Sequence, residues 1–210
     1  MRFLRVVVAG ADMTSRIGQV HTVRMSKSST AAGVLLAAGA GTRYGMPKVL
    51  AREGEWLQAA VTALHAGGCA EVVVVLGAAI VDVPPPARAV IAADWADGLS
   101  ASLRAGLAAV ESGPAGYAAL LTVDTPDVGA AVVRRVLAAA RSSASGLARA
   151  RYDGRPGHPV VVARRHWTQL AASATRDEGG RAFLRGRTDV VAVDCADLAT
   201  GIDLDVNPAP

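Results

Sequence analysis

The sequence of 210 residues is poor in aromatic residues and in cysteine. Only 4% of it is aromatic, and its two cysteines, Cys69 and Cys195, lie far apart and outside any CxxC spacing. Neither a zinc site nor a disulfide framework is therefore expected. No apolar run approaches the roughly 18 residues of a membrane-spanning helix. Arg5 interrupts the apolar start of the chain, which makes it a poor signal peptide. We expect a cytoplasmic protein with no membrane partner.

The sequence also has only a small excess of positive charge. The 22 basic and 18 acidic residues leave a formal net charge of +4. No run of Lys and Arg alternates with aromatic residues, a pattern that would indicate a nucleic-acid-binding surface. We therefore expect no nucleic-acid partner, and phosphorylated small molecules account for the excess of arginine at least as well.

The sequence is rich in aliphatic side chains, and 51% of its residues are hydrophobic. Valine-rich segments alternate with segments rich in alanine and leucine, which is typical of a three-layer α/β/α fold with a mostly parallel sheet. Strands are predicted at residues 33–38, 71–76, 88–92, 117–123, 147–152, 159–163 and 190–193, and helices at 56–66, 100–111, 130–141, 168–173 and 181–184. Residues 1–30 differ from this pattern. We expect a flexible N-terminal extension there and a single domain over residues 31–210.

A glycine-rich loop follows the first predicted strand. Residues 36–48 read Leu-Ala-Ala-Gly-Ala-Gly-Thr-Arg-Tyr-Gly-Met-Pro-Lys. In open parallel sheets ligands bind beyond the carboxyl ends of the strands, and glycines let backbone N–H groups approach a polyphosphate. Arg43 adds a permanently charged fork of donors, and Lys48 adds a mobile point charge. Gly45 comes one residue too late for the dinucleotide-binding fingerprint, and the Gly-Lys-Ser/Thr of a P-loop is missing.

An acidic residue ends another predicted strand. Asp124 directly follows the apolar residues 118–123, where a carboxylate is costly unless it is paired or bound to a metal. Mg²⁺ prefers one or two carboxylates together with phosphate oxygens and water. Asp124 is therefore a candidate metal ligand, and the alternative is a cap for the next helix.

The loop resembles the signature L-A-A-G-x-G-x-R-x-G-x-P-K of nucleotidyltransferases with a Rossmann-like, spore-coat-protein-like fold of the glycosyltransferase-A type. Within that superfamily it is most similar to the molybdenum cofactor cytidylyltransferases. Four further segments are similar to motifs of this family and follow in the same order: residues 94–103, 124–126, 154–159 and 177–181. Ile202-Asp203 stands where the family has I-D-T-P-E-D, although the residues that follow depart from that motif. The resemblance covers residues 33 to about 205.

The resemblance implies an enzyme that transfers CMP from CTP to the phosphate of molybdopterin and releases pyrophosphate, with Mg²⁺ as cofactor. Arg43, Lys48 and Asp124 would be catalytic. Asp124 and Asp203 would hold the metal ion, with Asp205 as the alternative second ligand. The nucleotide would be bound by Leu36, Ala37, Ala38, Gly39, Ala40, Gly41, Thr42, Arg43, Lys48, Gly77, Gly98 and Ser102.

On the acceptor side, the resemblance implies roles for His158 and Arg181. A structural hydrogen bond is the alternative for His158, and a place on a helix surface is the alternative for Arg181. Ser100, close to the nucleotide-binding Ser102, is read as a helix cap. A molybdoenzyme or its maturation factor is a further expected partner.

Three other functions stay open at this stage. The chain could be a guanylyltransferase, or another nucleotidyltransferase for small phosphates with the same fold. It could also be an NAD(P)-dependent oxidoreductase, because some relatives are described as acting on a nicotine-derived pigment, but the glycine spacing argues against a dinucleotide site. Finally, it could be a non-catalytic carrier of the cofactor.

Overall fold

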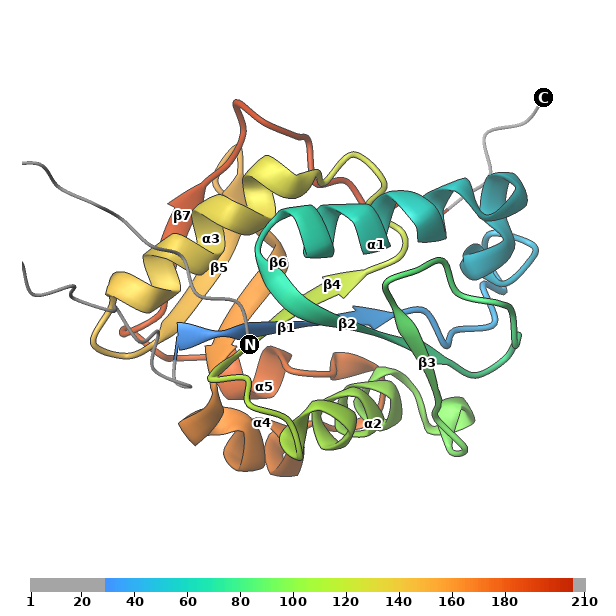
Figure 1. Cartoon of the computed structure of the whole chain (residues 1–210), viewed down its shortest axis with the longest axis horizontal. Helices are drawn as coiled ribbons and strands as arrows, with labels where there is room; N and C mark the ends of the chain where they lie inside the picture. The colour runs from blue at the N-terminus through green and yellow to red at the C-terminus, as the bar shows by residue number, and fades with distance from the viewer. Residues whose placement is uncertain (1–28, 206–210) are drawn as a thin grey trace, which may run out of the picture.

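The computed structural model describes residues 29–205. Its centre is one sheet of seven strands in the order β3-β2-β1-β4-β6-β5-β7 (Figure 1). The strands are β1 (Ala31–Leu36), β2 (Cys69–Leu76), β3 (Arg88–Ile91), β4 (Tyr117–Thr122), β5 (Leu147–Tyr152), β6 (Arg155–Ala163) and β7 (Val191–Asp194). Strand β6 runs antiparallel to both of its neighbours, and every other pairing is parallel. The carboxyl ends of β1, β2 and β4 therefore meet at one edge.

Five α-helices cover the two faces of this sheet. They are α1 (Glu55–Ala66), α2 (Leu99–Glu111), α3 (Ala130–Ser142), α4 (Trp167–Ser173) and α5 (Arg181–Leu184). Short 3₁₀ helices lie between them: η2 (Lys48–Gly54), η3 (Trp95–Asp97), η4 (Arg164–His166) and η5 (Arg176–Glu178). Helices α1 and α3 lie on one face, and α2, α4 and α5 lie on the other (Figure 1). This confirms the predicted three-layer α/β/α fold.

Each face of the sheet has its own apolar core. Leu64 of α1 and Leu137 of α3 belong to one buried cluster, while Leu103 of α2 and Leu170 of α4 belong to the other. Residues 72–75 are four consecutive valines, all at most 1% exposed, because a central parallel strand is covered on both sides. Gly106 brings α2 close to β1, since a Cβ there would lie 2.4 Å from Val34 Cγ1.

The predicted elements are present with shifted ends. The first strand ends at Leu36 rather than at residue 38, so that Ala37 and Ala38 already belong to the loop. The largest difference concerns the connection between the strands predicted at residues 147–152 and 159–163, where a longer turn was expected. The turn is formed instead by Asp153 and Gly154, with φ values of 48° and 80°, and β6 begins at Arg155. Two consecutive positive φ angles are typical of a tight hairpin turn, and Asp-Gly is one of its preferred sequences.

The predicted N-terminal extension, residues 1–30, lies outside the described residues except for its last two. Thr30 is attached to the segment before β4, because its carbonyl accepts the N–H groups of Gly116 and Tyr117. Among residues 29–205, no helix is both long and apolar enough to cross a membrane.

Candidate active site

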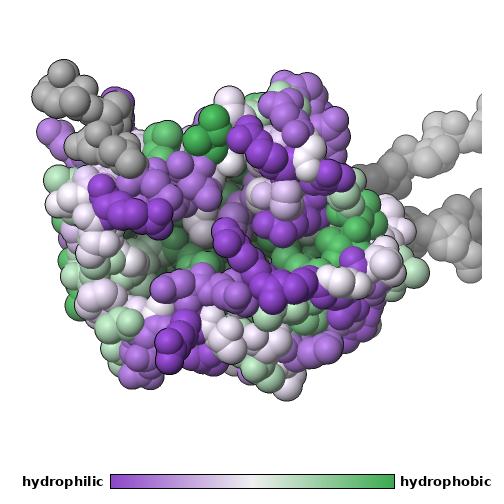
Figure 2. All heavy atoms as spheres, turned by 180° about the vertical axis from the view of Figure 1, so that it is seen from behind, coloured by the Kyte–Doolittle hydropathy of each residue, from purple (hydrophilic) through white to green (hydrophobic). Residues whose placement is uncertain are grey.

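Two cavities adjoin at the carboxyl edge of the sheet. The first, of about 580 Å³, is lined by the glycine-rich loop and by the segment from η3 to the start of α2. The second, of about 310 Å³, lies beside it under α5. Both are lined by Leu36, Arg43, Leu99, Thr122, Asp124 and Asp205. Seen from behind, the molecule is hollowed near its middle, with apolar side chains beneath a hydrophilic rim (Figure 2).

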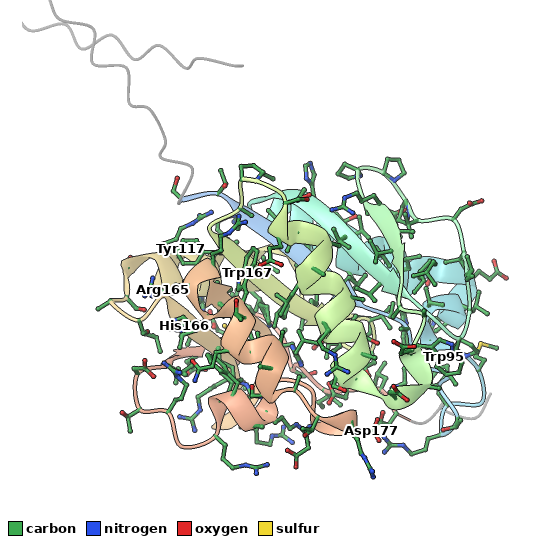
Figure 3. All side chains as sticks on the ribbon, turned by 90° about the horizontal axis from the view of Figure 1, so that it is seen from below. Trp95, Tyr117, Arg165, His166, Trp167 and Asp177 are labelled. Atoms are coloured by element: carbon green, nitrogen blue, oxygen red, sulfur yellow. The ribbon has the colours of Figure 1, made fainter. Side chains whose placement is uncertain are left out.

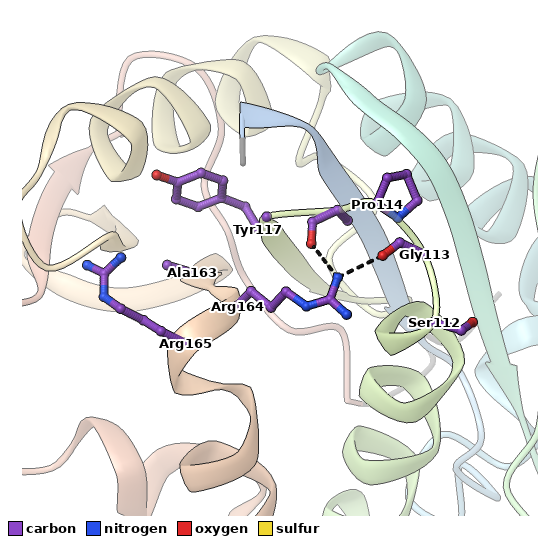
Figure 4. A pocket seen from close by; sticks show the side chains of 9 residues that line it. Ser112, Gly113, Pro114, Tyr117, Ala163, Arg164 and Arg165 are labelled. Atoms are coloured by element: carbon purple, nitrogen blue, oxygen red, sulfur yellow. Dashed lines mark hydrogen bonds between the residues drawn. The ribbon is translucent and has the colours of Figure 1, made fainter. Parts of the chain in front are cut away.

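A third hollow, of about 750 Å³, lies at the amino end of β4 and is structural. Both of its arginines are already engaged: Arg164 donates to the carbonyls of Gly113 (2.7 Å) and Ala115 (3.1 Å), and Arg165 donates to the carbonyl of Ala144 (2.7 Å) (Figure 4). Tyr117, which lines this hollow, lies far from Trp95 of the first cavity (Figure 3). The site is therefore placed at the carboxyl edge, where parallel sheets bind their ligands.

The glycine-rich loop folds back on itself at Gly41. The carbonyl of Gly41 accepts the N–H groups of Tyr44 (2.9 Å) and Gly45 (2.8 Å). Its φ is +62°, and a Cβ there would lie 1.9 Å from the carbonyl oxygen of Met46. The buried ring of Tyr44 packs against Trp56, with ring centroids 5.3 Å apart. This anchors the loop and leaves the side chain of Arg43 79% exposed above the cavity.

Lys48 joins the loop to the end of β4. Its Nζ donates to Asp124 Oδ2 at 3.0 Å and to Asp205 Oδ1 at 2.7 Å. Asp205 also pairs with Arg43 at 3.2 Å. Burial lowers the pKa of Lys48, but the hydrogen bonds to Asp205 and Asp124 outweigh it, and the net result is a raised pKa. Lys48 is therefore charged at neutral pH.

Asp124 has one oxygen that fits a divalent cation. Its Oδ1 is buried and has no hydrogen-bond partner, which is costly for a carboxylate in the absence of a cation. Burial, then the nearby charges of Asp124 and Asp205, raise the pKa of Asp203, as expected where carboxylates share one site. Within residues 29–205, no group of three or more His, Cys, Asp or Glu side chains could hold a metal ion. A cation here would have few protein ligands, which suits a metal that also binds phosphate oxygens.

The structure decides between several alternatives for the remaining predicted residues. Asp124 is not a helix cap, because α3 begins at Ala130 with Gly129 as its N-cap. Ser100 is not a cap either, because it lies inside the first turn of α2, which begins at Leu99. Gly98 and Ser102 line the first cavity, as predicted for the nucleotide side.

Gly77 lets two other residues pack closely. A Cβ at this position would lie 2.5 Å from Trp95 Cβ and 2.8 Å from Ala38 Cβ. Gly77 therefore lets Trp95 pack over the end of β2, and Trp95, not Gly77, faces the first cavity. That Gly77 contacts the nucleotide stays a prediction.

His158 and Arg181 both line the second cavity, next to Asp203. His158 Nδ1 lies 3.3 Å from the carbonyl of Leu120, and burial lowers the pKa of its imidazole below 6.5. The sequence analysis missed Arg149, which lines the same cavity from β5. Charged residues within a predicted strand were a partial signal for it, because β5 carries both Arg149 and Arg151.

Comparison with known families agrees with this geometry. The model of the MobA-like NTP transferase domain matches residues 33–192. The chain belongs to the MobA-like NTP transferase family. It therefore carries a nucleotidyltransferase domain, which confirms the predicted family and enzyme class.

Individual members of this family differ in their described activities. The chain is 36% identical over 189 residues to nicotine blue oxidoreductase of Paenarthrobacter nicotinovorans, a match that covers 82% of this chain and 91% of the relative.

Solved structures of related proteins share the fold. The crystal structure of Rv0371c from Mycobacterium tuberculosis has a TM-score of 0.69 and is 28% identical, over 85% of this chain and 94% of that one. The same protein in complex with manganese has a TM-score of 0.60 and is 27% identical, with the same coverage of both chains. A nucleotidyl transferase from Methanothermobacter thermautotroptrophicus has a TM-score of 0.67 over 84% of this chain and 92% of that one, but at 18% identity it shows the fold alone.

Proposed function

We propose that this MobA-like NTP transferase moves CMP from CTP to the phosphate of molybdopterin or its molybdenum form. The observation that carries the proposal is the position of Asp124. Its unpaired Oδ1 is buried at the border between a cavity walled by the glycine-rich loop and a cavity that carries His158 and Arg181. A nucleotide in the first cavity and an acceptor in the second would meet at this carboxylate.

The reaction needs positioning and charge neutralisation more than covalent help. An oxygen of the acceptor phosphate attacks the α-phosphorus of CTP, a new O–P bond forms, and the bond to pyrophosphate breaks. Arg43 and Lys48 border the first cavity and would neutralise the triphosphate and the charge on the departing pyrophosphate. Asp205 pairs with both cations and so holds them close together.

A divalent cation, in the proposal Mg²⁺, fits the free oxygen of Asp124. Asp203 is the second ligand that we favour, because Asp205 is already engaged by Lys48 and Arg43. The cation would supply positive charge to the phosphates when it is bound. The manganese complex of the related Mycobacterium tuberculosis protein supports a divalent metal in this family.

Pyrophosphate release tests the proposal. The purified protein is incubated with Mg²⁺, molybdopterin and each of the four NTPs in turn. Release with CTP alone is expected, and Asp124→Asn should reduce it by at least about 100-fold, as for other losses of charge stabilisation in a transition state. Asp82→Asn is the matched control, because Asp82 is exposed and lies outside both cavities. Release with GTP instead of CTP would favour a guanylyltransferase. Release without molybdopterin would contradict the proposal that molybdopterin is the acceptor.

An oxidoreductase is the second candidate, because a relative 36% identical over most of both chains is named nicotine blue oxidoreductase. The loop lacks the glycine spacing of a dinucleotide site, and its two cations favour a triphosphate. Consumption of NADH or NADPH by the purified protein with a quinone-like pigment, together with no pyrophosphate release from any NTP, would establish this candidate instead. Binding of Mo-cofactor without either reaction would indicate a carrier.

The cellular setting stays a prediction. A cytoplasmic location and a molybdoenzyme or its maturation factor as partner follow from the proposed reaction, since the nucleotide-bearing cofactor has to reach an apoenzyme. Co-purification of this chain with a molybdoenzyme that contains the cytosine form of the cofactor would support this part of the proposal.

A further inference from the structure

Strand β5 places an arginine against the second cavity. Side chains alternate between the two faces of a strand. Ala148, Ala150 and Tyr152 belong to the core under α1 and α3, whereas Leu147 belongs to the core on the opposite face. Arg149 therefore lies on the face covered by α4 and α5, where it lines the second cavity together with Arg181, the first residue of α5.

The guanidinium of Arg149 is held in place but not neutralised. Its Nε donates to the carbonyl of Gly157 at 3.1 Å, which fixes the side chain against the start of β6. Among residues 29–205, neither Arg149 nor Arg181 has a carboxylate within ion-pairing distance, whereas Arg43, Arg88, Arg135, Arg185 and Arg187 all do.

The two unpaired arginines influence each other. Burial first, and then the charge of Arg181, lower the pKa of Arg149, although an arginine stays charged at any pH near neutrality. Two like charges on one cavity wall are unfavourable unless a counter-charge binds between them. A phosphate dianion satisfies this requirement, because guanidinium groups bind it through paired N–H donors.

Other charged side chains line the second cavity besides Arg149 and Arg181. Asp203 lies on the same cavity and is within electrostatic reach of Arg181, while Asp124 lies at the border with the nucleotide cavity. Glu178, also on this cavity, pairs with Arg185 at 3.3 Å. The arginines of this cavity that lack an ion pair thus lie at β5 and α5, whereas Asp124 and Asp205 at the carboxyl edge of β4 are already paired with Lys48 and Arg43.

We propose that Arg149 and Arg181 together bind a phosphate monoester group of the acceptor and so select an acceptor that carries one. This inference rests on the proposed function for the identity of the cavity as the acceptor side. It adds Arg149, a residue in the middle of a strand, as a determinant of acceptor specificity. Arg43 and Lys48 are left to the triphosphate.

The test uses inorganic phosphate as a probe, so that it does not depend on turnover. Calorimetry measures phosphate binding to the full-length protein that is already saturated with CTP and Mg²⁺, which fills the loop site. Arg149→Gln and Arg181→Gln should each weaken phosphate binding about ten-fold, the loss expected for one charge-assisted hydrogen bond. Arg149→Lys should recover part of the affinity, because lysine keeps the positive charge but lacks the paired N–H donors of a guanidinium.

Arg151→Gln is the matched control. Arg151 lies two residues further along β5 on the same face, but its guanidinium is bound to the carbonyl of Gly154 in the hairpin turn. This variant should bind phosphate as the wild type does. Because Arg181 is exposed, Arg181→Gln tests the site even if Arg149→Gln fails to fold.

Turnover provides the second measurement. With molybdopterin as acceptor, the two variants should raise its KM about ten-fold and lower kcat/KM by at least as much, because they hold the phosphate that reacts, while the CTP affinity stays within about two-fold of the wild type. Lost phosphate binding with no pyrophosphate release in any protein would uphold this site and overturn the proposed reaction. Normal phosphate binding and an unchanged acceptor KM in both variants would overturn the site, whether or not the enzyme transfers CMP.

Discussion

Lys48 Nζ lies 3.0 Å from Asp124 Oδ2, although 76 residues separate the two in the sequence. The contact links the loop after β1 to the end of β4, which are adjacent parallel strands with Leu36 paired to Thr122. It places a cation of the proposed triphosphate site directly beside the candidate metal ligand. This ion pair therefore holds the glycine-rich loop against the end of β4.

Replacing Lys48 should separate catalysis from metal binding. Lys48→Met removes the charge that faces the phosphates, and we expect pyrophosphate release to fall by at least about 100-fold. It also removes a competitor for Asp124, so Mn²⁺ should bind as tightly as in the wild type or more tightly. Pyrophosphate assays and a Mn²⁺ titration followed by electron paramagnetic resonance measure both effects. Unchanged activity would show that Lys48 only stabilises the loop.

Asp203 and Asp205 should respond differently to substitution. Asp205 is bound by Lys48 and Arg43, whereas Asp203 forms no ion pair within residues 29–205, and burial followed by the charges of Asp124 and Asp205 raises its pKa. Asp203→Asn is therefore expected to weaken Mn²⁺ binding about ten-fold or more, and Asp205→Asn is expected to change it by less than about three-fold. The same titration with both variants decides the second ligand. The reverse order would assign the metal to Asp205.

Acidification should destabilise the protein through His158. Burial lowers the pKa of this imidazole below its ordinary value of 6.5. As the pH falls below 6.5, the unfolded chain binds a proton that the folded protein still excludes, and the free energy of unfolding decreases by up to about 1.4 kcal/mol per pH unit. Urea unfolding of the wild type and of His158→Asn between pH 7.5 and 5 measures this pH dependence of the free energy of unfolding. The variant should lose less stability over this range, and parallel curves would contradict the expectation.

Gly41→Ala should distort the loop. A positive φ costs a non-glycine residue about 1 to 2 kcal/mol, and the new Cβ would lie 1.9 Å from the carbonyl oxygen of Met46. We expect the free energy of unfolding to decrease by at least about 1 kcal/mol and CTP affinity to fall about ten-fold or more. Gly39→Ala is the control for stability, because its Cβ would meet no atom within 4 Å. Equal stabilities of the two variants would show that the turn is not tightly constrained.

The sequence predicted the fold, which the structure confirms, and the glycine-rich loop that we propose as the phosphate side of the site. Runs of valine fixed the positions of the central strands, because a strand covered on both faces needs apolar side chains throughout. The spacing of Gly39, Gly41, Arg43 and Lys48 identified the loop, since these residues act through local backbone geometry and charge. The strand predicted to begin at residue 159 begins at Arg155 instead, because Asp153 and Gly154 alone form the tight hairpin turn.

The pairing of distant residues depended on the tertiary structure. The resemblance named Asp203 as the second metal ligand with Asp205 as the alternative, and only the packing of the C-terminal segment brings Asp205 to Lys48 and Arg43. Sequence also gave no reason to join Arg149 to Arg181, which meet on one cavity because α5 covers the face of β5 that carries Arg149. Short-range patterns decide which elements form and which loop binds phosphate, whereas charges that act across a cavity depend on the order of the strands and on the helices that cover them.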